Sequence, residues 1–125
     1  QVSITFTAFD FLDEGSWKSL PPFDVIVSNP PYIPFNEMDK LDKHVTGYEP
    51  HAALFVEEGK PLLFYEKIAL FAQTHLKEGG KIFMETHEGL AYECAALFSN
   101  YNYESAVVKD MSGNNRFVTA ILRYP

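Results

Sequence analysis

The alternation of apolar and polar positions predicts two strands in the first part of the chain. Residues 2–8 alternate with a period of two, which is typical of a half-buried strand. Residues 23–28 contain three consecutive β-branched side chains, and such a run favours a strand of a parallel sheet buried on both faces. Residues 10–22 between them indicate a loop with one helical turn. Two prolines at 30–31 must end the second strand, because proline cannot donate to the ladder.

The middle of the chain predicts a long connection followed by helix, strand and helix. Residues 32–59 are polar and aromatic, and connections of this length are often functional. From Pro61 apolar side chains recur at helical spacing until the glycine pair at 79–80, which is expected to end the helix. A short strand over 81–85 and a second helix over 88–99 are expected next.

The end of the chain predicts a hairpin. Residues 105–110 and 117–124 read as strands, and the Ser-Gly-Asn-Asn sequence at 112–115 favours a turn with positive φ. Strands that alternate with helices indicate an α/β fold with a mostly parallel sheet, to which the hairpin adds an antiparallel edge.

Composition is that of one small globular domain. Apolar residues make up 46% of the 125 residues, with eleven Phe, seven Tyr and one Trp. No apolar run approaches the roughly 18 residues that would indicate a membrane span, and no signal peptide is visible. The single cysteine, Cys94, lies among Ala and Leu residues and is expected to be a buried helical thiol. Because a lone cysteine cannot form an internal disulfide, a protein of the reducing cytoplasm is expected.

The net charge argues against nucleic acid as a partner, and the spacing of the histidines argues against a metal site. The formal charge is −7 and Lys and Arg do not cluster, which argues against a free-standing nucleic-acid binder and leaves a basic protein partner open. The four histidines lack the spacing of metal ligands, so no metal site is expected.

The tetrapeptide Asn29-Pro30-Pro31-Tyr32 directly follows the strand predicted at 23–28. In open α/β sheets, ligands bind at the carboxyl ends of strands. The Asn29 side chain and the Pro30 peptide carbonyl can offer two acceptors to an NH₂ group, while Tyr32 can lie flat against a planar amide or base. We therefore expect all four residues to bind substrate, with Asn29 and Pro30 catalytic. An ordinary proline turn is the alternative interpretation.

Such a pair of acceptors suits methylation of an amide nitrogen. The nitrogen lone pair is delocalised into the carbonyl, so two acceptors on its hydrogens raise its electron density and point it at the incoming methyl. Positioning is then the main catalytic need, and no strong general base is evident beside the motif.

With the sequence Phe-Asp-Val-Ile-Val-Ser before it, the tetrapeptide resembles the signature of amino-group methyltransferases with a Rossmann-like fold. This resemblance implies S-adenosylmethionine as cofactor. Asp10 would accept from its adenine amino group, Phe11 would pack near its ring, and Asn29 would also contact it. A cap of a helical turn is the alternative for Asp10, with Asp13 as a neighbouring candidate.

Three further segments narrow the resemblance to the family that methylates a glutamine of peptide-chain release factors. They are residues 48–55, residues 61–65, and the Asp-x-x-Gly-x-x-Arg pattern at 110–116. A solvated loop and a plain hairpin turn are the alternatives for the first and last. Two other functions stay open: an adenine-specific nucleic-acid methyltransferase, and a non-catalytic module that keeps the motif as a scaffold turn.

Parts of the family pattern are missing from the sequence. The glycine-rich cofactor loop, the acidic residue for the ribose and the N-terminal helical domain are absent, and the chain begins with Gln. Residues 1–125 are therefore expected to be the C-terminal half of a Rossmann-like catalytic domain, inactive in isolation. By resemblance, two strands would separate 2–8 from 23–28. Without them the unpaired edge at 23–28 is expected to lead either to self-association or to pairing of residues 2–8 in a position that the family does not use.

Overall fold

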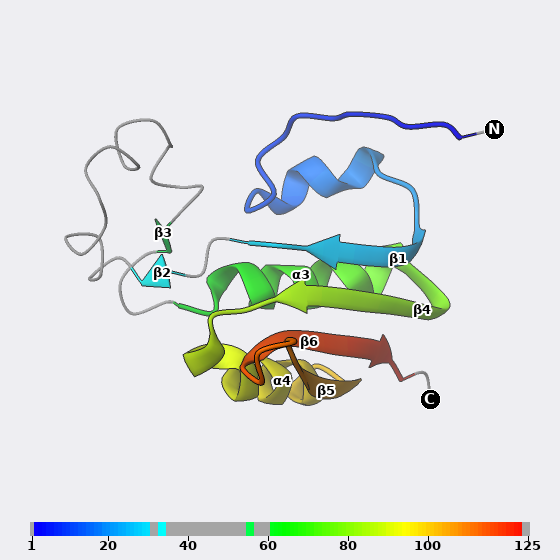
Figure 1. The fold of residues 1–125 in the computed structure, drawn as a ribbon. Coiled ribbons are helices and arrows are strands. Elements are labelled where there is room, and N and C mark those ends of the chain that lie inside the picture. The colour runs from blue at the N-terminus through cyan, green and yellow to red at the C-terminus, as the bar shows by residue number, and fades with distance from the viewer. Residues whose placement is uncertain (1, 31–32, 35–54, 57–60, 124–125) are drawn as a thin grey trace.

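Four strands form the main sheet in the computed structural model, which describes residues 2–30, 33–34, 55–56 and 61–123. Their order across the sheet is β1 (Phe23–Ser28), β4 (Leu76–Glu85), β6 (Asn115–Leu122) and β5 (Tyr103–Lys109). β1 and β4 are parallel, whereas β6 runs antiparallel to both β4 and β5 (Figure 1). The sheet is therefore mixed, and the predicted α/β fold with a terminal antiparallel hairpin is confirmed.

Two α-helices make the connections between these strands. α3 (Leu63–His75) precedes β4, and α4 (Ala91–Asn100), preceded by the short 3₁₀ helix η3 (Glu88–Leu90), precedes β5. Near the N-terminus lies the 3₁₀ helix η1 (Glu14–Ser19), the helical turn that the sequence predicts. A separate parallel pair is formed by β2 (Ile33–Pro34) and β3 (Phe55–Val56).

Both α-helices pack against the same face of the sheet. Ile82 and Met84 of β4 pair in register with Ala120 and Val118 of β6, and all four point into one core. Because side chains alternate along a strand, this face takes every second residue. The helical side chains of that core are Tyr65, Ile68, Ala69, Ala72, Ala91, Cys94 and Phe98.

The opposite face of the sheet is uncovered by described residues. We call it the open face. Its large apolar side chains come from all four strands and are 37–77% exposed: Val25, Val27, Phe83, Val108, Phe117 and Ile121. Pairing in register places Val27 beside Phe83, and Phe117 beside both Glu85 and Val108, which confirms that they share one face. Large exposed apolar patches are unusual on soluble monomeric proteins. Where they occur, they mark interaction sites.

The expectation that residues 23–28 are buried on both faces is therefore wrong for the described chain. Val25 and Val27 are 52% and 77% exposed, while Ile26 between them faces the helices. Among the described residues β1 pairs with β4 alone, so its other edge is free as predicted.

The predicted strand at 2–8 is also wrong. These residues are extended but belong to no strand, and all are exposed, with Phe6 at 92%. In Figure 1 this segment lies on the β1 side of the sheet, beyond η1. Alternation alone cannot make a strand, because a strand needs a neighbour that completes its backbone hydrogen bonds.

The glycine pair at 79–80 does not end the preceding helix, which was expected to reach it. α3 ends at His75, and both glycines lie within β4, which starts earlier than predicted. Here the register with β1 jumps, since Phe23 pairs with Leu76 but Val25 pairs with Lys81. A Cβ on Gly80 would lie 2.8 Å from the backbone oxygen of Asp24, and Gly79 has φ +79°. The glycines therefore permit an irregular, close approach of β4 to β1.

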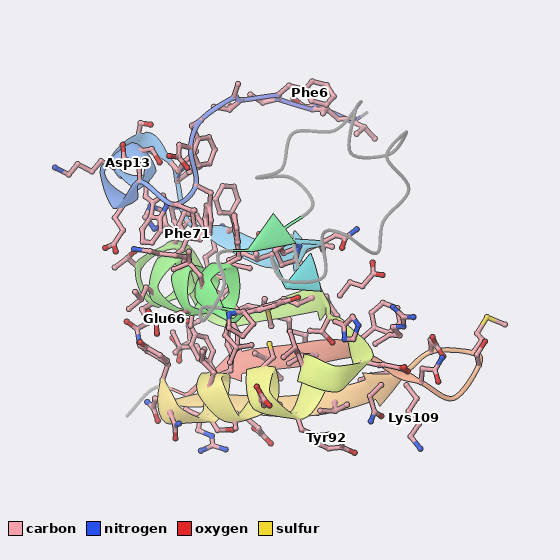
Figure 2. The ribbon with its side chains drawn as sticks, turned by 90° about the vertical axis from the view of Figure 1, so that its left-hand side faces the viewer. Phe6, Asp13, Glu66, Phe71, Tyr92 and Lys109 are labelled. Atoms are coloured by element: carbon pink, nitrogen blue, oxygen red, sulfur yellow. The ribbon has the colours of Figure 1, made fainter. Side chains whose placement is uncertain are left out.

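An aromatic cluster attaches η1 to α3. The Phe71 ring of α3 lies 5.4 Å from that of Phe11, 5.3 Å from that of Trp17 and 4.4 Å from that of His75. The Trp17 indole donates to the Phe11 carbonyl at 2.9 Å, and its own carbonyl lies 2.9 Å from His75 Nε2. Figure 2 shows Phe71 pointing from α3 toward the N-terminal segment.

Candidate active site

The proposed catalytic asparagine lies where the sequence predicts, immediately beyond the carboxyl end of β1. The last pair of the parallel ladder is Ser28 with Met84, so Asn29 is the first residue past it. Asn29 is exposed and Pro30 is buried. The alternation that places Val25 and Val27 on the open face places Asn29 there too, whereas Pro30 falls on the helix side.

The carboxyl end of β4 lies beside this position. Glu85 is the last residue of β4, and the Tyr65 hydroxyl of α3 donates to its backbone oxygen at 2.8 Å. The next residue, Thr86, donates its backbone N–H to the Arg116 carbonyl at 2.7 Å. Two parallel strands thus end together, and the second is held in place by α3 on one side and by β6 on the other.

Glu85, which the sequence interpretation did not name as a site residue, ends β4 near this position. Residues 81–85 were predicted as a strand, and carboxyl ends of neighbouring parallel strands meet at one edge of a sheet. The order of strands, which the sequence interpretation left open, brings the carboxyl ends of β1 and β4 to the same edge of the sheet.

Two buried side-chain oxygens at the same edge lack a hydrogen-bond partner in the described part of the chain: Thr86 Oγ1 and Asn115 Oδ1. Asn115 is the first residue of β6, which runs antiparallel to β4 and so begins where β4 ends. Unpaired buried polar atoms are rare and cost about 1–3 kcal/mol each, and they concentrate at functional sites. The edge of the sheet where β4 ends therefore contains unpaired buried polar atoms, whereas the other described buried side-chain polar atoms have hydrogen-bond partners.

Asp10 and Phe11 lie in the turn before η1. Figure 1 places that turn at the end of the sheet where β1 ends. Asp10 Oδ1 accepts from the Leu12 N–H at 3.0 Å, and the carboxylate is exposed. Asp13, the neighbouring candidate, caps η1 by accepting from Gly15 N–H. Asp10 is therefore not needed as the cap, and one of its oxygens remains available for an adenine amino group. The Phe11 ring is fixed against Trp17 and Phe71.

The remaining predicted site residues lie either outside the described residues or in the hairpin turn at 110–116. Pro31, Tyr32 and most of 48–55 lie outside the described residues, so their predicted roles stay predictions. The pattern at 110–116 forms a hairpin turn in which Asp110 Oδ1 accepts from the N–H groups of Ser112 and Asn114, both at 2.9 Å. That arrangement matches the plain-turn alternative.

Cys94 is a buried helical thiol, as predicted. It is free and fully buried on α4, and burial raises its pKa to about 12, so it is no nucleophile at neutral pH. The described residues contain no cluster of three or more His, Cys, Asp or Glu suited to a metal ion. Within the same residues, every helix is too short or too polar to cross a bilayer.

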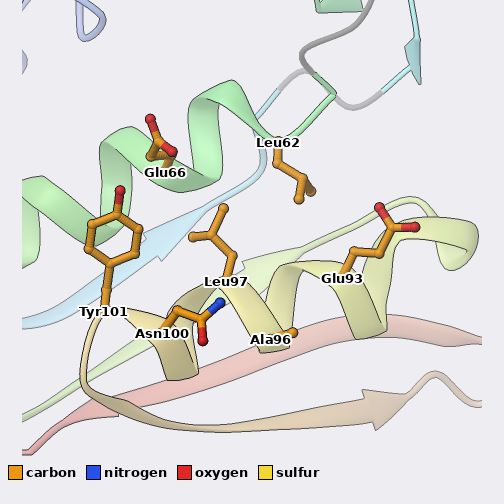
Figure 3. Close-up of a pocket in the computed structure, with 7 residues that line it drawn as sticks. All are labelled: Leu62, Glu66, Glu93, Ala96, Leu97, Asn100 and Tyr101. Atoms are coloured by element: carbon orange, nitrogen blue, oxygen red, sulfur yellow. The ribbon is translucent and has the colours of Figure 1, made fainter.

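An open groove of about 460 Å³ lies elsewhere, between α3 and α4. Figure 3 shows Leu62 and Leu97 pointing toward one another across it, with Glu66 and Glu93 at its borders. Burial and the neighbouring charge of Glu66 raise the pKa of Tyr101 at one end. The groove contains none of the predicted site residues, so it is separate from the edge formed by β1 and β4.

Comparison with known proteins identifies relatives over almost the whole chain. It is 38% identical over 124 residues to the release factor glutamine methyltransferase of Flavobacterium psychrophilum, covering 98% of this chain and 43% of the relative. The enzyme of the same name from Lactococcus lactis is 37% identical over 121 residues, covering 95% and 43%. A bifunctional methyltransferase of Rickettsia typhi is 40% identical over 97 residues, covering 77% and 18%. The chain thus spans less than half the length of these relatives.

Comparison with solved structures gives a weaker match than comparison with sequences, and comparison with family models gives none. A release factor-specific protein-(glutamine-N5) methyltransferase from Alicyclobacillus acidocaldarius matches with a TM-score of 0.44 and 16% identity, covering 90% of each chain. No family model matches the chain. The match to the Flavobacterium psychrophilum relative covers 124 residues, so it includes β1, Asn29 and the terminal hairpin. Over the part of their length that it spans, the chain belongs to the family of the release factor glutamine methyltransferases.

Proposed function

We propose that the chain carries the substrate-binding half of an enzyme that transfers a methyl group to the side-chain amide nitrogen of a glutamine in a peptide-chain release factor. The observation that carries this proposal is Asn29-Pro30 at the carboxyl end of β1, beside the end of β4, in a chain 38% identical to such an enzyme. Acceptors at a strand end can bind an NH₂ group without competing with the ladder.

Asn29 Oδ1 and the Pro30 carbonyl would accept from the two hydrogens of the glutamine amide. This pairing fixes the plane of the amide and directs the nitrogen lone pair toward the methyl donor, so the residues act by orientation. The exposed position of Asn29 leaves its side chain accessible to a substrate loop, whereas burial of Pro30 holds the turn. The acidic charge of −7 suits a protein substrate over a phosphate backbone.

The cofactor of this reaction is proposed to be S-adenosylmethionine, which supplies a methyl group already activated on a sulfonium. Asp10 and Phe11 fit the adenine end, since Asp10 retains an open carboxylate oxygen and the Phe11 ring is held by the aromatic cluster. Residues for the rest of the cofactor would come from the part of the relatives that this chain does not span.

Replacement of Asn29 tests the proposal. In a full-length form of the protein, Asn29→Ala should lower turnover on a release factor about 100-fold or more, the loss expected when a group that orients the transition state is removed. Asn100→Ala is the matched control, because Asn100 is an exposed amide on α4 beside the separate groove. Near-normal turnover of Asn29→Ala would refute the assignment, and label in DNA but not in protein would favour the adenine-specific alternative.

On its own, the 125-residue chain is proposed to self-associate and to bind S-adenosylmethionine weakly. The open face exposes six large apolar side chains next to the free edge of β1, and exposed apolar patches and unpaired strand edges both promote association. In the full-length protein the part not spanned here would cover that face. Sedimentation that shows a stable monomer, together with calorimetry that shows tight binding of the cofactor, would refute both statements.

A further inference from the structure

We propose that the groove between α3 and α4 is a docking site for a basic amphipathic protein segment, in which lysine or arginine side chains flank apolar ones. The inference goes beyond the proposed function, because the groove contains no residue assigned to methyl transfer. Both of its helices lie on the face of the sheet opposite the open face. Its test is a binding measurement and needs no catalytic turnover.

Helical side chains form both walls of the groove. On α3, Leu62 is the N-cap and Glu66 lies in the first turn, and the Glu66 N–H donates to the Leu62 carbonyl at 2.9 Å. On α4 the lining residues recur at the spacing i, i+3, i+4 and i+7, which places them on one side of a helix. They are Glu93, Ala96, Leu97 and Asn100. At 1.5 Å per residue this row is about 10 Å long, or two helical turns.

The middle of the groove is apolar. Leu62 and Leu97 point toward one another across it, and both are half-buried (Figure 3). Ala96, next to Leu97, is exposed. A volume of about 460 Å³ has room for more than one apolar side chain. Entry of such side chains would remove the exposed parts of both leucines from water, which favours binding.

The charged side chains that line the groove are both carboxylates. Figure 3 shows Glu66 and Glu93 toward opposite ends of it, with the two leucines between them. None of the lining residues is a cation, and among the described residues no cation pairs with either carboxylate. Lys67, which follows Glu66 in the chain, is paired with Glu14 at 2.6 Å.

This distribution of charge selects the class of partner. Carboxylates on both sides of an apolar middle complement cations on both sides of apolar side chains. They repel the phosphates of a nucleic acid, as does the net charge of −7. The occupant that matches both the charge and the apolar middle is therefore a basic amphipathic segment of a protein.

Fluorescence anisotropy of a labelled peptide tests the proposal on a full-length form of the protein. The peptide is about 16 residues long, in an alanine background that favours a helix. Lysines at i and i+7 flank leucines at i+3 and i+4, the same spacing as the α4 row. We expect saturable binding. Combined Glu66→Gln and Glu93→Gln should weaken it about 5- to 10-fold, because two partly exposed ion pairs are lost.

Two further variants separate the groove from general attraction by charge. Combined Glu78→Gln and Glu104→Gln removes the same charge at exposed positions outside the groove, and the affinity should be almost unchanged. Ala96→Arg introduces a cation at an exposed helical position inside the groove, so it should abolish binding without disturbing the core.

Several results would overturn the proposal. They are the absence of saturable binding, equal losses of affinity in the two glutamate-to-glutamine pairs, and equal affinity for a peptide with glutamine in place of both lysines. Spermidine that displaces the labelled peptide as effectively as unlabelled peptide does would also overturn it, because a polyamine has no leucine side chains to fill the apolar middle. Methylation of a release factor plays no part in any of these readouts, so failure of the proposed function leaves them unaffected.

Discussion

Phe71 contacts the N-terminal segment and packs against Phe11, one of the residues proposed to bind the adenine end of the cofactor. Its side chain is 6% exposed, and its ring lies within 6.4 Å of four other rings, including those of Phe11 and Trp17. Burial of a Phe side chain contributes about 1.5–3 kcal/mol, and each well-oriented aromatic pair adds about 0.5–1.5 kcal/mol. Because the neighbours cannot fully close the cavity, Phe71→Ala should reduce the free energy of unfolding by about 3–5 kcal/mol.

Urea denaturation of the 125-residue chain at low protein concentration measures this loss. Trp17 is the single tryptophan and contacts Phe71 directly, so its fluorescence reports on the cluster while circular dichroism reports on the helices. Phe71→Leu, which preserves most of the volume, should cost only about 1.5 kcal/mol. Tyr92→Ala, an aromatic truncation at a side chain 67% exposed on α4, should cost about 0.5 kcal/mol or less. If Phe71→Ala proves as mild as Tyr92→Ala, the cluster does not hold η1 on α3.

Further predictions concern Cys94, Gly80 and Tyr103. The pKa of about 12 for Cys94 predicts no reaction with thiol reagents at pH 8 until the chain unfolds, and rapid labelling of the native chain would contradict its burial. Because the folded state keeps this thiol protonated, the associated stability is complete below about pH 9 and declines toward pH 12, as a denaturation series over pH would show. Gly80→Ala should destabilise by about 1–3 kcal/mol in urea, since its Cβ would lie 2.8 Å from Asp24 O; an unchanged midpoint would argue against the close approach. Tyr103→Phe should cost about 1 kcal/mol, because the buried hydroxyl donates to Ala69 O, and a neutral result would exclude that bond.

Local chemistry was sufficient to predict much of the fold. The helical spacing after Pro61 and the turn residues near Gly113 predicted α3 and the β5–β6 hairpin to within a few residues, because each signal depends on the segment itself. Residues 2–8 and 23–28 were misjudged for the opposite reason. Whether their apolar side chains are buried depends on strands and helices that the described chain does not contain.

The candidate site was predictable only in part. Asn29 follows a strand in the sequence, and a strand end is a local property, so its position was foreseen. Glu85 lies 56 residues further along, and its place at the same edge of the sheet depends on β4 pairing with β1 in parallel, which no short segment encodes. The unpaired buried oxygens of Thr86 and Asn115 could not be predicted from the sequence either. Burial without a hydrogen-bond partner depends on how the strands assemble at this edge of the sheet.

The most direct test of the proposed function is to locate the transferred methyl group. A full-length form of the protein is incubated with labelled S-adenosylmethionine, a release factor and DNA, and the products are mapped by tandem mass spectrometry. The proposal predicts one methyl group on the side-chain nitrogen of a single glutamine in the release factor, and none with Asn29→Ala on the same timescale. Label on adenine in the DNA, or on a release-factor residue other than glutamine, would contradict it.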